Sequence, residues 1–260
     1  MARELTPAQL IERSIQKKYR KALWTPFILA VKRYALIREG DRVAVCVRGD
    51  GNTMLLAKLV QLLERYSDVP LRAIYMALDP GGDPESLKRL EESAALLGIP
   101  LERIGANAGE HPSSGARLSR LYAGARTLGC NKIALGQCFS DVVESTVAAM
   151  LYGGRLRGVM PKERSVGFEG MELIRPLYCV HEEDIAAWRD YNRLEFAPDG
   201  NGGPSGRQAV RRLLKTMRRD DPDIEKSVFN AIHAVSLDTF PAWRMGGETH
   251  GFLESYDQKT

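Results

Sequence analysis

Residues 42–59 read RVAVCVRGDGNTMLLAKL, and this stretch decides the fold. The run at 42–47 is β-branched and almost continuously apolar, which predicts a buried parallel strand. A loop with two glycines follows at 48–53, and a helix is expected from Met54 to about Tyr66. A loop between a buried strand and a helix is a candidate anion site, because its backbone N–H groups and the helix dipole favour negative charge. The Walker pattern of phosphate-binding loops is absent.

The same pattern continues on both sides of this stretch. Further strands are predicted at 70–78, 100–104, 132–135 and 171–175, and helices at 83–97, 116–128 and 141–152. This alternation predicts an α/β fold with an open parallel sheet of about five strands and helices on both faces. In such sheets ligands bind outside the carboxyl ends of the strands.

Helical regions are expected to flank the sheet. Apolar spacing predicts a helix over 5–37 that Pro26 kinks or splits. Helices are predicted at 182–191, 207–219 and 222–236, with a turn-rich loop between the first two. The predicted domains are therefore an N-terminal helical arm (1–40), an α/β nucleotide-binding domain (41–180) and a C-terminal helical region (181–260).

Composition excludes several classes of protein. With 44% hydrophobic and 27% charged residues, the 260-residue chain has ordinary globular composition. Its net charge of +4 is too mild to demand nucleic acid. The four cysteines lie far apart without a CxxC pair, which excludes a disulfide-dense scaffold and a four-cysteine zinc site. No apolar stretch predicts a membrane span or a signal peptide, so we expect a cytoplasmic protein with no membrane partner.

Several segments carry a family resemblance. Residues 43–59 resemble the start of the PP-loop ATPases, whose loop reads SGGxDS. Residues 131–141 lie where the tRNA 2-thiocytidine synthetase branch has a strand followed by GHHxDD. Residues 150–162 and 174–177 resemble the next helix end and strand of that branch. The segments are collinear from about residue 20 to about residue 245, so the chain is identified as a member of this branch, with an adenine nucleotide alpha hydrolase-like sheet expected.

The resemblance also implies a chemistry. Members spend ATP to adenylate a pyrimidine in tRNA, and sulfur then replaces the adenylated oxygen. The branch holds an iron–sulfur cluster on two CxxC motifs. The resemblance places nucleotide binding at Arg48, Gly49, Asp50, Gly51, Asn52, Thr53, Met76 and Gly136.

The residues that carry this chemistry are mostly replaced here. In the loop only Gly49 matches the motif, Gly51 replaces a lysine, and Asp50 adds a negative charge that would repel phosphate. Both histidines of GHHxDD are missing from residues 136–141.

The cluster motifs are replaced as well. The places of the first CxxC hold Pro112 and Gly115, and the second should fall around 198–203, where no cysteine occurs. We therefore expect no iron–sulfur cluster, because such clusters are held by thiolates.

Single residues near the expected ligand site allow two interpretations each. Asp141, the one candidate catalytic residue, stands three residues before Glu144 on one helix face. It is either a carboxylate that interacts with the helix dipole or a magnesium ligand. Cys46 is interpreted as a core residue, and Cys138 as a packed thiol or a residue lining the site. The four histidines lack metal-like spacing, and no metal site is assigned.

Basic residues gather in two segments. They could contact tRNA phosphates or form solvated, ion-paired surface. The acidic run at 220–223 would weaken the second group. The residues are Lys17, Lys18, Arg20 and Lys21 in the arm, Arg207, Arg211, Arg212, Lys215, Arg218 and Arg219 in the C-terminal region, and Lys162 and Arg175 near the expected cleft.

Three functional hypotheses follow, and whether the chain is an enzyme stays open. The favoured one is a pseudoenzyme of the family with a degenerate catalytic site, which binds tRNA, ATP and Mg²⁺ weakly or not at all. The first alternative is an active ATP-dependent tRNA sulfurtransferase, in which Arg48 substitutes for the missing lysine. The second is a structural partner of an intact relative. A homodimer is the other expected assembly.

Overall fold

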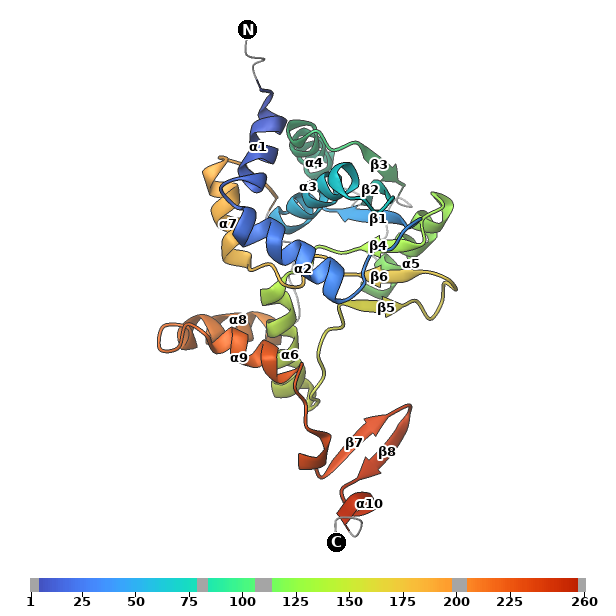
Figure 1. Ribbon diagram of the computed structural model, residues 1–260, viewed down its shortest axis with the longest axis vertical. Helices are drawn as coiled ribbons and strands as arrows, with labels where there is room; N and C mark the ends of the chain where they lie inside the picture. Colours follow the sequence, from blue (N-terminus) through green and yellow to red (C-terminus); the bar gives the residue numbers. More distant parts are fainter. Residues whose placement is uncertain (1–4, 79–83, 106–113, 198–204, 257–260) are drawn as a thin grey trace. The chain divides into compact units, whose positions relative to one another are not determined.

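The computed structural model describes residues 5–78, 84–105, 114–197 and 205–256 (Figure 1). The chain forms two compact units, Met1–Gln208 and Ala209–Thr260. Pro112, His111 and the loop at 198–203, which the sequence interpretation used, lie outside the described residues.

The first unit is built on a six-stranded sheet in the order β3-β2-β1-β4-β6-β5. Neighbouring strands are parallel, except that β5 runs antiparallel to β6. The predicted open parallel sheet is confirmed, and the edge strand β5 is an addition that was not predicted, because its sequence Lys-Glu-Arg has no apolar residue. The bounds are β1 Arg42–Val47, β2 Arg72–Leu78, β3 Leu101–Ile104, β4 Lys132–Ala134, β5 Lys162–Arg164 and β6 Glu172–Ile174.

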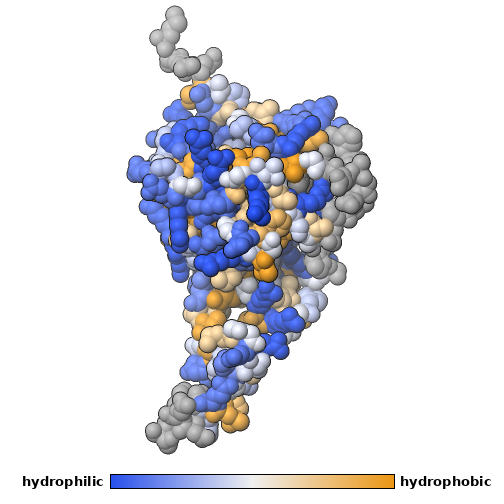
Figure 2. Space-filling view, turned by 90° about the vertical axis from the view of Figure 1, so that its right-hand side faces the viewer, coloured by the Kyte–Doolittle hydropathy of each residue, from blue (hydrophilic) through white to orange (hydrophobic). Residues whose placement is uncertain are grey.

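Helices cover both faces of the sheet (Figure 1). The face of Ala44, Cys46 and Ile133 packs with Leu121 and Ala125 of α5 into one buried cluster. Helix α3 lies on the opposite face. Hydrophilic side chains cover much of the face of this unit seen in Figure 2, with apolar ones scattered between them. The bounds are α3 Gly51–Tyr66, α4 Pro84–Leu97, α5 Ser114–Thr127, α6 Phe139–Gly153 and α7 Glu182–Tyr191.

The N-terminal arm consists of three helical segments, where a helical run over 5–37 was predicted to be kinked or split at Pro26. They are α1 Pro7–Gln16, the π-helix η1 Arg20–Trp24 and α2 Thr25–Arg33. Thr6 begins α1 with a capping box to Gln9. Pro26 lies in the first turn of α2, where its missing N–H is tolerated, so the predicted split at Pro26 is confirmed, and the predicted kink is not what forms. Within the described ranges, no helix is long and apolar enough to cross a membrane.

The second unit contains a β-hairpin that the sequence interpretation missed. Strands β7 Ala242–Met245 and β8 Glu248–Gly251 pair antiparallel. They are joined by Gly246 and Gly247, which both have positive φ, as a two-residue hairpin turn requires. The helix predicted to run to 236 ends at Ala231. The helical elements are α8 Ser205–Met217, which begins in the first unit, α9 Ile224–Ala231, a 3-10 turn at Leu237–Thr239 and α10 Leu253–Tyr256.

Candidate functional site

The loop after β1 closes on itself. Asp50 is the N-cap of α3, and its carboxylate accepts the Thr53 backbone N–H at 3.0 Å. The Thr53 hydroxyl accepts the Arg48 N–H at 3.1 Å and donates to the Asp50 carbonyl at 3.2 Å. Gly49 has φ +84, which permits the turn. A carboxylate of the protein thus takes an N–H group that a bound anion would use at a helix N-terminus.

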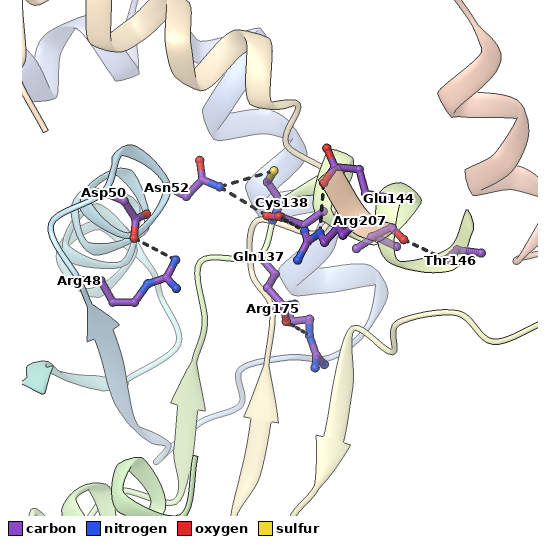
Figure 3. A network of polar contacts seen from close by, with 11 residues as sticks. Arg48, Asp50, Asn52, Gln137, Cys138, Glu144, Thr146, Arg175 and Arg207 are labelled. Atoms are coloured by element: carbon purple, nitrogen blue, oxygen red, sulfur yellow. Dashed lines mark hydrogen bonds and ion pairs between the residues drawn. The ribbon is translucent and has the colours of Figure 1, made fainter. Parts of the chain in front are cut away.

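Arg48 is also engaged within this loop. Its guanidinium lies 2.9 Å from the Asp50 carboxylate (Figure 3). The Arg48 side chain is 47% exposed and that of Asp50 is 3% exposed. The buried carboxylate therefore has a cation beside it, and the positive charge of Arg48 is compensated inside the loop.

Two neighbouring segments of the chain pack against the loop at 48–53. A Cβ atom added to Gly136, just after β4, would lie 2.9 Å from the Thr53 methyl and 3.2 Å from the Thr53 nitrogen. The Ala197 N–H donates to the Gly49 carbonyl at 2.9 Å. A Cβ atom on Gly51 would contact the Phe196 ring at 3.7 Å. Gly136, Phe196 and Ala197 therefore lie against the loop.

A buried polar cluster joins α3 to α6. The Asp141 carboxylate accepts the Cys138 backbone N–H at 2.9 Å and so caps α6. The Asn52 side-chain amide lies 3.5 Å from the Asp141 carboxylate and 3.7 Å from the Cys138 sulfur (Figure 3). All three residues are buried. Asp141 therefore lies at the helix N-terminus, the position named in one of its two sequence interpretations.

Arg207 completes this cluster. Its guanidinium pairs with the Asp141 carboxylate and, at 3.2 Å, with that of Glu144. The Arg207 side chain is 18% exposed, whereas both carboxylates are buried. In the part of the chain that the structure describes, no group of three or more histidine, cysteine, aspartate or glutamate side chains could hold a metal ion.

The four cysteines, all described, do not converge. Cys46 lies in β1, Cys138 precedes α6, and Cys130 and Cys179 lie in two other segments. Burial raises the pKa of the Cys46 thiol to about 11 and raises the pKa of the other three as well. Thiolates are the form that binds metal, so these residues do not fit an iron–sulfur cluster.

The remaining predicted residues are spread over the first unit. Met76 is fully buried in the core cluster. The Lys162 ammonium donates to the Ala35 carbonyl at 2.9 Å. Arg175 is buried, donates to Gln137 and lies 3.1 Å from the Glu163 carboxylate. Met76 and Arg175 therefore contribute to packing within the unit.

The predicted basic groups differ in exposure. Lys17, Lys18, Arg20 and Lys21 are all exposed. The Lys18 ammonium lies 3.7 Å from the centre of the Tyr191 ring, which is cation–π geometry. In the second unit, Arg212 and Lys215 are exposed and Arg211 is half-buried.

Sequence reasoning missed the pairing of Arg207 with α6 and the burial of Lys58. The Lys58 ammonium in α3 contacts the Glu12 carboxylate at 2.6 Å and the Leu97 carbonyl at 2.9 Å. A lysine at an apolar position of a predicted helix is the one feature that could have indicated a buried ion pair.

Comparison with known proteins gives consistent results. No family model matches the chain. The chain is 30% identical to the tRNA-cytidine(32) 2-sulfurtransferase of Syntrophotalea carbinolica over 223 aligned residues. The alignment covers 79% of this chain and 86% of the relative. The chain is 31% identical to the protein of the same name from Aliivibrio fischeri over 250 aligned residues. That alignment covers 89% of this chain and 80% of the relative.

A solved structure shares the fold. It is the U34-tRNA thiolase NcsA from Methanococcus maripaludis with its 4Fe–4S cluster. The TM-score is 0.65 at 14% sequence identity, over 82% of this chain and 79% of the other. The likeness confirms the adenine nucleotide alpha hydrolase-like sheet.

Proposed function

The chain belongs to the tRNA-cytidine(32) 2-sulfurtransferase family, and we propose that it is a member that binds tRNA but no longer thiolates it. In this proposal the nucleotide loop binds ATP and Mg²⁺ weakly or not at all, and no iron–sulfur cluster forms.

The observation that carries the proposal is the position of Asp50. Its buried carboxylate caps α3 and pairs with Arg48, so a negative charge of the protein stands at the helix N-terminus. A phosphate arriving there would meet the like charge of Asp50, whose side chain is buried and therefore weakly screened by solvent. It would also have to displace the hydrogen bond that Asp50 makes to Thr53.

Two further features support the loss of thiolation. Mg²⁺ is held by carboxylate oxygens, yet Asp141 and Glu144 are paired with the Arg207 guanidinium. The cysteines lie in separate segments; three of them are buried and Cys179 is half-buried. Neither group fits the cofactors that the family resemblance implies.

The active-enzyme alternative depends on Arg48. Its side chain is half-exposed, so the guanidinium could turn from Asp50 to a phosphate. The two functions therefore differ in turnover, and turnover can be measured directly.

The test measures ATP binding and pyrophosphate release, with and without bulk tRNA, beside an intact relative as the positive control. We expect tRNA binding without pyrophosphate release above background. Pyrophosphate release that depends on tRNA would overturn the proposal in favour of an active enzyme. A protein that binds neither ATP nor tRNA would overturn it in favour of a structural partner.

A further inference from the structure

The N-terminal arm carries a pocket remote in sequence from the loop at 48–53. Its volume is about 240 Å³. It lies where the end of α1 and the π-helix η1 face the last turns of α3. The lining residues are Gln16, Lys17, Arg20, Trp24, Leu62 and Tyr66.

The π-helix explains how this pocket forms. The Tyr19 N–H donates to the Ser14 carbonyl five residues earlier, at 2.9 Å, where a regular α-helix would bond four residues apart. The wider turn rotates Arg20 and Trp24 relative to α1. Single-turn π segments occur frequently at functional sites.

The lining combines two kinds of group. Trp24 and Tyr66 supply aromatic rings over the buried Leu62, and the Tyr66 side chain is 60% exposed. Lys17 and Arg20 supply exposed cations. Within the described residues, no carboxylate pairs with either cation. Aromatic rings beside exposed cations are suited to a flat base that carries a phosphate.

We propose that this pocket binds a nucleotide, with the base against Trp24 and Tyr66 and the phosphate at Lys17 and Arg20. The lining offers aromatic rings and two cations, which provide for one base and its phosphate. The source is an unpaired nucleotide of RNA or a free mononucleotide, which share this chemistry. The RNA form rests on the tRNA binding proposed above, and the exposed Lys18 would face a neighbouring phosphate.

The test uses the full chain and a fluorescently labelled uridylate decamer, with binding measured by anisotropy. Tyr66→Ala should lower the affinity about fivefold or more, because a base loses about that much when its aromatic partner is removed. Tyr66→Phe keeps the ring and should restore most of the affinity. Arg20→Ala should also weaken binding more than Lys21→Ala, a matched control outside the pocket lining. Thermal melts establish equal folding.

Competition by a free nucleotide distinguishes the two possible ligands, and a parallel tRNA measurement tests the proposed function separately. If uridine monophosphate competes at the same nucleotide concentration as the decamer, the ligand is a free nucleotide; weaker competition identifies RNA. Equal affinities for Tyr66→Ala, Arg20→Ala and Lys21→Ala would overturn the inference, as would a decamer that does not bind. Bulk tRNA measured in parallel tests the proposed function separately, since tRNA could bind through other surfaces with the pocket variants unaffected.

Discussion

The loop at 48–53 and the pocket on the N-terminal arm both place an arginine beside the end of a helix. They differ in whether a carboxylate of the protein lies next to that arginine. In the loop, Arg48 lies 2.9 Å from the buried Asp50 carboxylate. In the pocket, Arg20 and Lys17 are exposed beside aromatic rings. A cation that is already paired must break that pair before it can bind an anion, whereas a cation without a partner among the described residues has no such pair to break there. At the family's nucleotide-loop position the arginine is thus held by a carboxylate, while exposed cations lie on the N-terminal arm, where we propose the nucleotide site.

The largest expected loss of stability comes from breaking the ion pairs of Arg207 with Asp141 and Glu144. Arg207→Met would leave the carboxylates of Asp141 and Glu144 buried without their shared cation. Removing one partner of a buried pair costs about 3–5 kcal/mol, and the partial exposure of Arg207 places the loss toward the lower end. The free energy of unfolding is measured by urea denaturation.

The matched control is Arg189→Met. Arg189 pairs with Asp190 on the surface, with both side chains well exposed. Its loss should fall below about 1 kcal/mol. Equal losses for the two variants would show that the cluster around Arg207 does not hold the unit together.

The second experiment changes the loop toward a phosphate site. Asp50→Gly with Gly51→Lys removes the carboxylate from the start of α3 and adds an ammonium. A charge-assisted contact is worth about 1.5–3 kcal/mol, so ATP affinity should rise about ten- to a hundredfold. Equilibrium binding of ATP with Mg²⁺ is the measurement.

Asp50→Asn separates charge from capping, because asparagine also caps helices. It should give a smaller rise in ATP affinity with no loss of stability. The contact of Phe196 with Gly51 sets a limit to the double variant, since the new lysine must pass this ring. If the parent protein already binds ATP as tightly as the double variant, the loop is not degenerate.

The third experiment loosens the arm. Glu12 in α1 holds Lys58 at 2.6 Å and Arg65 at 2.8 Å, next to the pocket residue Tyr66. Burial alone would raise the pKa of Glu12, but hydrogen bonds and charges of Lys58 and Arg65 outweigh it and lower the pKa below 4.5. Glu12→Gln should cost about 1.5–3 kcal/mol at pH 7.

The pH dependence of this loss has a defined sign. Since the folded-state pKa of Glu12 is lowered, its stabilisation is present above about pH 4.5 and disappears as pH falls through the folded-state pKa. The difference between parent and Glu12→Gln should therefore shrink in acid. A difference that stays constant from pH 7 to pH 3 would contradict this account.

The smallest effect is expected from the second unit. Arg212 and Lys215 are exposed, and replacing each by alanine should weaken tRNA binding slightly and alike for all tRNAs. Each lost phosphate contact should reduce the slope of log affinity against log salt by about 0.7–0.9. Unchanged slopes would remove these two residues from the RNA surface and leave the arm as the stronger candidate.

Local patterns were enough for most of the sheet. The run at 42–47 became β1 with the predicted bounds, and 182–191 became α7 with the predicted bounds. Both depend on apolar spacing within one segment, which the chain carries whatever surrounds it. The sequence alone also showed that Asp50 and Gly51 replace a glycine and a lysine of the family's loop motif. The edge strand β5 and the hairpin of the second unit were missed, because a strand of three or four residues is too short to show a period in its spacing.

The partners of the charges were decided by tertiary structure. Arg207 was predicted to face RNA from the basic spacing of its helix, yet it pairs with Asp141 and Glu144, more than sixty residues away in the sequence. The pocket on the arm depends on a π turn and on the approach of Tyr66 from α3, which no periodicity within 5–37 specifies. The sequence by itself determined the sheet, the family and the loss of the motif residues, because these depend on residue identity and local spacing. Which charges are compensated and which face solvent was decided only in the folded chain, because an ion pair requires two side chains to meet in space.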